Sequence, residues 1–93
     1  MTTVLVVDDE PSLVTLLTYN LKKSGFDVVS ATDGPSAITT LAEQPIDIIL
    51  LDVMLPGKSG VEVTRELRAE KNRIPIIMLT ALDEEVDKIL GLE

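Results

Sequence analysis

Hydrophobic and polar positions follow two alternating periods along the chain. Short runs rich in apolar residues cover 3–7, 27–31, 46–51 and 74–80, and after each run the apolar positions recur every three to four residues. The runs predict strands and the segments between them predict amphipathic helices. We expect helices over residues 11–23, 34–44 and 59 to about 71, and a last one marked by Val86, Ile89 and Leu90.

The predicted helices carry recognisable boundary residues. Gly25 closes the first helix, Pro35 stands near the start of the second and Pro45 ends it, and Ser59 with Glu62 forms a capping box that opens the third. The apolar faces are expected to consist of Leu13, Leu16, Leu17 and Leu21 in the first helix and Ile38, Leu41 and Ala42 in the second.

Four strand–helix alternations indicate an α/β fold of βαβ units around a parallel sheet. In such sheets ligands bind beyond the carboxyl ends of the strands, where the strand order reverses. Asp8 and Asp9 follow the first strand, Asp52 follows the third, and Thr80 ends the fourth. These four residues converge if the first and third strands are neighbours, which the pattern alone does not prove.

Each of these residues also has an ordinary structural explanation. An acid before Pro11 can cap a helix, Asp52 can be a turn residue before "MLPG", and Thr80 can be a strand-end threonine. The combination at one end of the sheet weighs against coincidence. It favours a functional site.

Composition limits the chemistry of that site. The chain has 93 residues, enough for one small domain, and 45% of them are hydrophobic, which is typical of a globular protein. Cysteine and histidine are absent, so carboxylates, hydroxyls and amines must supply the reactive groups. No apolar run approaches the ~18 residues of a membrane span, and the N-terminus lacks the basic region of a signal peptide. A cytoplasmic protein is expected.

Charge points to a bound cation. Sixteen acidic and eight basic residues give a net charge of −8, which argues against a nucleic-acid surface on this segment. Two carboxylates ~5 Å apart repel by about 3 kcal/mol at an effective dielectric of ~20, so a converging set needs a proton or a cation. Oxygen-only ligands suit Mg²⁺, which also reaches for phosphoryl oxygens. Asp52 would then be a nucleophile that forms an aspartyl phosphate, with Thr80 donating its hydroxyl and Ala81 leaving space.

The segments "VLVVDDE", "IILLDVMLPGKSG" and "PIIMLTA" resemble the receiver domain of two-component response regulators. This resemblance implies a flavodoxin-like doubly wound sheet with strand order 2-1-3-4, phosphorylated on Asp by a sensor histidine kinase. The segments "VTLLTYNLKKSGFDVV" and "MLPGKSGVEVTRELR" further resemble the OmpR/PhoB class, especially PhoP-like regulators of Gram-positive bacteria.

The resemblance assigns roles by position. It implies that Asp52 accepts the phosphoryl group and that Asp8, Asp9 and Asp52 hold Mg²⁺, Asp9 directly, with the Met54 backbone carbonyl as a further ligand. Thr80 is the switch hydroxyl and Ala81 follows it. The domain is expected to be no enzyme but a phosphoacceptor that assists its own phosphorylation. Its dephosphorylation should be slow, because Met54 and Leu82 are apolar and cannot position an attacking water.

The chain also departs from the family. Receiver domains continue into a fifth strand, with a lysine that pairs with the phosphoryl group, and a fifth helix; Lys58 and Lys88 are not in that position. We therefore expect residues 1–93 to be a receiver domain that is incomplete at its C-terminus. In the intact protein, phosphorylation would switch homodimerisation and DNA binding by a winged-helix domain that this chain lacks.

Two other functions fit these residues less well. An aspartyl-phosphate hydrolase would use an acid two residues after its nucleophile, where this chain has Met54, and a nucleotide or flavin binder would want a Gly- or Ser/Thr-rich loop in place of "DDEPS". A non-catalytic protein-interaction or dimerisation fragment of the same fold stays open. Mg²⁺ binding distinguishes it from a working receiver.

Overall fold

The computed structural model describes residues 2–55 and 58–79. Within them lies a parallel sheet of four strands in the order β2-β1-β3-β4, which confirms the predicted flavodoxin-like fold. The strands are β1 (Thr3–Val7), β2 (Asp27–Ala31), β3 (Ile48–Asp52) and β4 (Ile76–Leu79), and the helices are α1 (Pro11–Lys23), α2 (Gly34–Glu43) and α3 (Gly60–Ala69). The expected helix around Val86, Ile89 and Leu90 lies outside the described residues.

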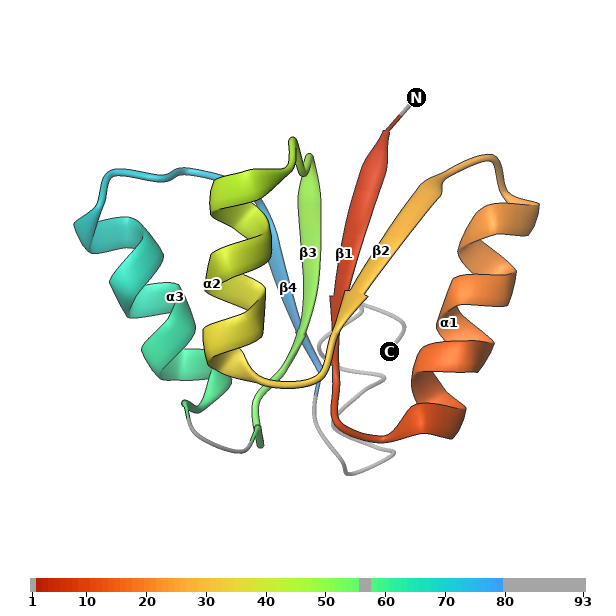
Figure 1. The fold of residues 1–93 in the computed structure, drawn as a ribbon, viewed down its shortest axis with the longest axis horizontal. Coiled ribbons are helices and arrows are strands. Elements are labelled where there is room, and N and C mark those ends of the chain that lie inside the picture. The colour runs from red at the N-terminus through yellow and green to blue at the C-terminus, as the bar shows by residue number, and fades with distance from the viewer. Residues whose placement is uncertain (1, 56–57, 80–93) are drawn as a thin grey trace, which may run out of the picture.

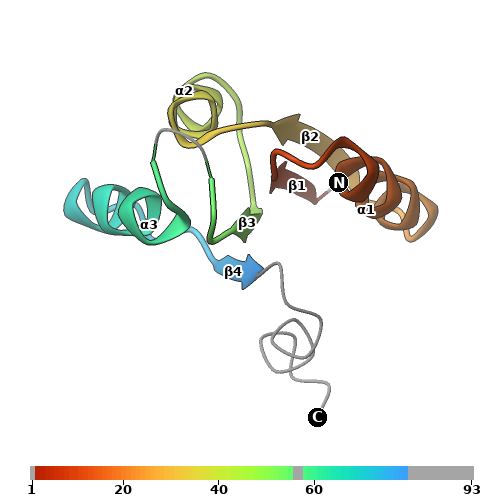
Figure 2. The ribbon, with the colours of Figure 1, turned by 90° about the horizontal axis from the view of Figure 1, so that it is seen from below.

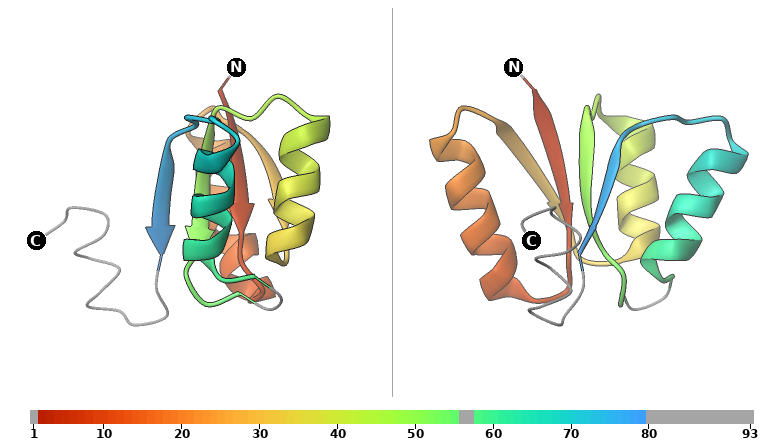
Figure 3. Two further views of the ribbon diagram at one scale, coloured as in Figure 1. Left: turned by 90° about the vertical axis from the view of Figure 1, so that its left-hand side faces the viewer. Right: turned by 180° about the vertical axis from the view of Figure 1, so that it is seen from behind.

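The sheet is covered on both faces. Helices α2 and α3 lie on one face and α1 lies on the other (Figure 2). Strands β1 and β3 run side by side in the middle, with β2 and β4 outside them (Figures 1 and 3). All four strands end at the lower border of the sheet in Figure 1, which we call the carboxyl edge. The loops that lead into α1 and α3 leave from this edge.

The central pair sets the register of the fold. Val7 of β1 lies beside Ala31 of β2 on one side and beside Leu51 of β3 on the other. This pairing confirms the neighbour relation that the sequence pattern left open. It brings the residues that follow Val7 and Leu51 to the same point of the carboxyl edge.

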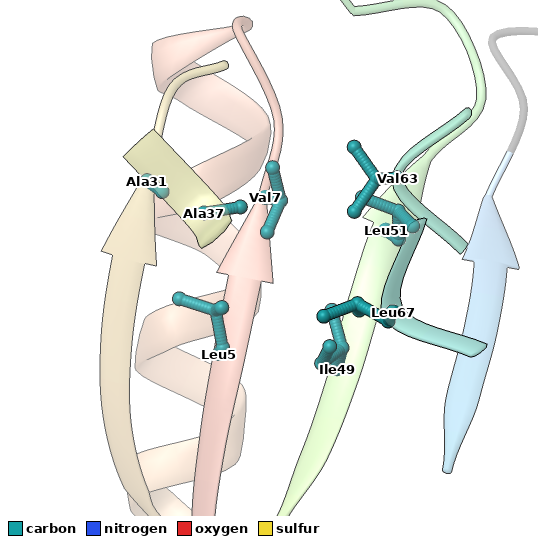
Figure 4. Packing of buried hydrophobic residues seen from close by; sticks show 8 residues of the cluster. All are labelled: Leu5, Val7, Ala31, Ala37, Ile49, Leu51, Val63 and Leu67. Atoms are coloured by element: carbon teal, nitrogen blue, oxygen red, sulfur yellow. The ribbon is translucent and has the colours of Figure 1, made fainter. Parts of the chain in front are cut away.

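The core lies between the sheet and the pair α2 and α3 (Figure 4). Side chains alternate between the faces of a strand, so every second residue of β1 and β3 turns toward these helices. The buried members of the core are Leu5, Val7, Ala31, Ala37, Ile49, Leu51, Val63 and Leu67. Because β1 and β3 are buried on both faces, their sequences are almost entirely apolar.

The helix boundaries follow local hydrogen bonds. The predicted capping box is confirmed: Glu62 N–H donates to Ser59 Oγ at 3.2 Å, and Ser59 N–H donates to Glu62 Oε1 at 3.1 Å. The cap of α2 was not predicted: Ser36 N–H donates to Asp33 Oδ1 at 2.7 Å. Gly25 follows α1 with φ +97°, a left-handed conformation that glycine adopts without strain.

Two strand predictions were too long at their starts. Strand β3 begins at Ile48 instead of residue 46, because its pairing with β1 starts at Val4. It includes Asp52, because Asp52 pairs with Leu79 of β4. Strand β4 begins at Ile76 instead of residue 74. Pro75 has no N–H to donate, and Ile74 N–H donates to the side chain of Asn72 at 3.0 Å.

The predicted helix faces were also partly wrong. In α1, Leu13, Leu17 and Leu21 are half-buried at four-residue spacing, but Leu16 is 56% exposed. Val14 and Thr18 are half-buried beside these leucines, so the packed face of α1 turns away from Leu16. In α2 the buried alanine is Ala37, while Ala42 is exposed. No helix among the described residues is long and apolar enough to cross a membrane.

The burial difference between neighbours in β3 predicts unequal sensitivity to the same change. Ile49 is fully buried in the core, whereas Ile48 is only half-buried on the opposite face. Ile49→Val should lower the free energy of unfolding by about 0.5–1.5 kcal/mol, because the lost methylene leaves unfilled space. Ile48→Val should lower the free energy of unfolding by a smaller amount. Urea denaturation followed by circular dichroism measures both, and equal losses would contradict the described packing.

Candidate functional site

Three carboxylates meet at the carboxyl edge of the sheet. Asp8 directly follows β1, Asp52 is the last residue of β3, and Asp9 comes next along the loop into α1. One carboxylate oxygen from each lies within 4.8 Å of the others. The predicted convergence of these three residues is therefore confirmed. Thr80 and Ala81, which the sequence also assigned to the site, lie outside the described residues, as do Leu82 and Lys88.

Asp8 is held in place by the start of the loop. Its N–H donates to the carbonyl of Ala31 at 3.2 Å, which extends the pairing of β1 with β2 by one residue. Its Oδ1 accepts the N–H of Glu10 at 2.9 Å. The residue is only 3% exposed, whereas the next residue, Asp9, is exposed. Asp8 thus presents a buried carboxylate and Asp9 an accessible one.

The helix-capping explanation does not account for these acids. Glu10 is the residue that precedes α1, but its side chain caps no backbone N–H of the helix. Its Oε1 accepts the hydroxyl of Ser12 at 3.0 Å. Asp8 Oδ1 accepts its hydrogen bond from the N–H of Glu10, and Glu10 precedes the helix.

Asp52 is both a strand residue and a turn residue. It lies beside Leu79 of β4 and is 7% exposed. Its Oδ1 accepts the N–H of Met54 at 3.0 Å, a bond typical of an aspartate that initiates a turn. The turn explanation is therefore correct for one carboxylate oxygen. This bond engages Oδ1 and not the second carboxylate oxygen of Asp52.

Burial disfavours the ionised forms of the Asp8 and Asp52 carboxylates. It raises the pKa of Asp8 against the lowering effect of the Glu10 N–H, and the negative charges of Asp52 and Asp9 raise it further. Burial likewise raises the pKa of Asp52, where the Met54 N–H opposes it and the charge of Asp9 adds to it. Such a site gains stability when a cation neutralises it.

No lysine or arginine within residues 2–55 and 58–79 forms an ion pair with these aspartates. Lys58 pairs with Glu66 of α3 at 3.1 Å. Three oxygen ligands without a protein cation are the donor set that Mg²⁺ takes, usually with retained waters. The residues present therefore fit the ion that the sequence implied.

Gly60 also touches the site and was not predicted from the sequence, where only its neighbour Ser59 was noted, as a helix cap. Gly60 lies against the backbone of Asp52. A glycine in the first turn of a helix carried no signal by itself. Gly60 lies there because α3 begins against the end of β3.

Comparisons with known proteins agree with this geometry. The chain is 57% identical over 90 residues to the alkaline phosphatase synthesis transcriptional regulatory protein PhoP of Bacillus subtilis (strain 168). That match covers 97% of this chain but only 38% of PhoP.

Among the solved structures that are similar to this chain, two bear on the site. One is the response regulator TrrA of Thermotoga maritima in complex with Mg²⁺–BeF, with TM-score 0.83, 38% identity and coverage of 90% of this chain and 73% of that one. The other is the histidine kinase ThkA in complex with TrrA, with TM-score 0.81, 40% identity and coverage of 87% and 70%.

The family model of the response regulator receiver domain, which describes the sequences of that family, matches residues 4–93. That range includes all of β1 except Thr3, and all of β3, so it contains Asp8, Asp9 and Asp52. This chain belongs to the receiver domain family of response regulators.

Proposed function

We propose that Asp52 accepts a phosphoryl group from a phosphohistidine of a sensor histidine kinase. One observation carries the proposal: the buried carboxylate of Asp52 lies within reach of Asp8 and Asp9 at the carboxyl edge, with one oxygen not engaged by the Met54 N–H. The complex of TrrA with its histidine kinase supports a partner of this class.

Asp8, Asp9 and Asp52 are the proposed Mg²⁺ ligands, with the Met54 backbone carbonyl as the fourth protein ligand. The Mg²⁺–BeF complex of TrrA supports this assignment. The net charge of −8 would repel an anionic phosphoryl group. When bound, Mg²⁺ supplies the positive charge that offsets this repulsion at the site. Asp9, the exposed member of the set, is the residue through which the ion is expected to enter.

The transfer itself needs little from the protein beyond position. The second oxygen of Asp52 attacks phosphorus, the bond between phosphorus and the histidine nitrogen breaks, and its electron pair stays on that nitrogen. The Met54 N–H holds the first oxygen and so orients the attacking one. Thr80 is the proposed hydroxyl donor to the transferred group, and Ala81 is proposed to leave space beside it.

The output belongs to a longer protein. PhoP is a transcriptional regulatory protein of which this chain spans 38%, so the effect on transcription is a proposal for the whole molecule. We propose that phosphorylation of Asp52 changes homodimerisation and thereby DNA binding by a winged-helix domain. The chain is proposed to work in the cytoplasm, as a phosphoacceptor and not as an autonomous enzyme.

Phosphorylation should depend on both Asp52 and Mg²⁺. Incubation with acetyl phosphate and Mg²⁺ should add one phosphoryl mass to the chain, because the donor replaces the kinase and the protein supplies the site. Intact mass spectrometry measures the adduct. Asp52→Asn should show none, and neither should the wild type without Mg²⁺.

Asp27→Asn is the matched control, because Asp27 is an exposed aspartate at the start of β2. It should be phosphorylated like the wild type. An adduct that persists in Asp52→Asn would place the phosphoacceptor elsewhere. A wild type that gains no mass would favour the non-catalytic interaction fragment.

Without metal, Asp52→Asn should stabilise the fold. The raised pKa of Asp52 means that the folded chain binds a proton more readily than the unfolded chain, so ionisation costs stability above the raised pKa. Removing this charge should raise the thermal midpoint at pH 7 by on the order of 5 °C.

The gain should shrink as the pH falls through the raised pKa, and it should vanish below the ordinary pKa of aspartate, where both states are protonated. Thermal unfolding in EDTA at several pH values tests this, with Asp27→Asn as the control. A loss of stability at pH 7 would mean that the buried charge is already compensated.

Met54 controls how long the phosphoryl group should last. Its side chain is 70% exposed beside Asp52 and has no group that could orient a water molecule. Met54→Asn should speed dephosphorylation, by about tenfold or more, because an amide can hold water near phosphorus. The decay of the mass adduct after removal of the donor measures the rate. Met54→Leu should decay like the wild type, and equal rates in all three chains would refute this role.

A further inference from the structure

Helix α3 begins directly against the end of β3. A Cβ atom built on Gly60 would lie 2.5 Å from the carbonyl oxygen of Asp52 and 3.0 Å from the Cα of Val53. Both neighbours are backbone atoms, which cannot turn aside as a flexible side chain can. Only glycine allows this approach.

A series of backbone hydrogen bonds connects this contact with the Asp52 carboxylate. Val53 N–H donates to the Leu79 carbonyl at 2.8 Å, and the Val53 carbonyl accepts the N–H of Gly60 at 2.9 Å. Val53 is thereby held between β4 and α3. The next N–H along the chain, that of Met54, donates to Asp52 Oδ1.

A shift of the backbone at Asp52 and Val53 would therefore move the carboxylate. The carboxylate has little freedom to compensate, because Asp52 is 7% exposed and its Oδ1 is bound by the adjacent turn. The distance to Asp8 and Asp9 would change, and a misplacement of about 1 Å can cost a reaction about 100-fold.

We propose that Gly60 is a positioning residue for Asp52. By lacking a Cβ and donating its N–H to Val53, it holds the end of β3 where the Asp52 carboxylate meets Asp8 and Asp9. This inference rests on the proposed function, since it concerns the geometry of the same site.

The test compares Gly60→Ala with Gly25→Ala. Gly25 has φ +97° and open space around its Cα, so alanine there strains the backbone without touching the site. Both changes should lower the urea midpoint. The wild type and both variants are then compared for Mg²⁺ affinity by calorimetry and for the rate of phosphorylation by acetyl phosphate, at a temperature where each is folded by circular dichroism.

Gly60→Ala should bind Mg²⁺ about tenfold more weakly and should be phosphorylated at least about tenfold more slowly. Gly25→Ala should stay within about twofold of the wild type in both. If Gly60→Ala also stays within about twofold, the inference is wrong while the proposed function stands. If the wild type itself neither binds Mg²⁺ nor gains a phosphoryl group, the proposed function fails and the inference with it.

A second variant decides the question if Gly60→Ala does not fold. Replacing the amide of Gly60 by an ester, through chemical ligation, removes the N–H to Val53 but adds no Cβ. The loss of one backbone hydrogen bond should weaken Mg²⁺ binding by between about twofold and tenfold. An ester variant with wild-type Mg²⁺ affinity and phosphorylation rate would overturn the proposed role of this contact.

Discussion

The parallel pairing of β1 with β3 is the constraint on which the rest of the structure depends. Because Val7 lies beside Leu51, the chain delivers Asp8 and Asp52 to the same point as each strand ends. A change of register by one residue would also turn every apolar side chain of the strand to the opposite face. The core and the site are therefore set by the same hydrogen-bonded ladder.

That arrangement works against the stability of the metal-free chain. Burial raises the pKa of both Asp8 and Asp52, and each is further raised by the negative charge of a neighbour. The hydrogen bonds from Glu10 and Met54 offset only part of this cost. Because the ionised carboxylates destabilise the fold when no cation is bound, a cation that neutralises them is bound favourably. This is the physical link between the fold and its proposed Mg²⁺-dependent chemistry.

The sequence predicted the elements that depend on local signals. The strand–helix alternation as far as β4, the capping box at Ser59 and the helix end at Gly25 were correct, because propensity and capping act over a few residues. The start of β4 was wrong because the side chain of Asn72 takes the N–H of Ile74. The exposure of Leu16 was missed because the width of a buried face depends on the partner.

The site was predictable in its residue types but not in its support. Asp8, Asp9 and Asp52 stood out because acids follow apolar strands, and the family resemblance supplied their roles. The approach of Gly60 to Asp52 depends on where α3 begins relative to the end of β3, which no local pattern encodes.

Titration of Mg²⁺ into the chain, followed by calorimetry, tests the central claim most directly. The account predicts a single binding site that is lost or strongly weakened in Asp9→Asn. It also predicts that this site is retained in Glu10→Gln, which removes a neighbouring exposed acid outside the cluster. Equal affinity in the two variants, or no binding by the wild type, would contradict a metal centre built from Asp8, Asp9 and Asp52.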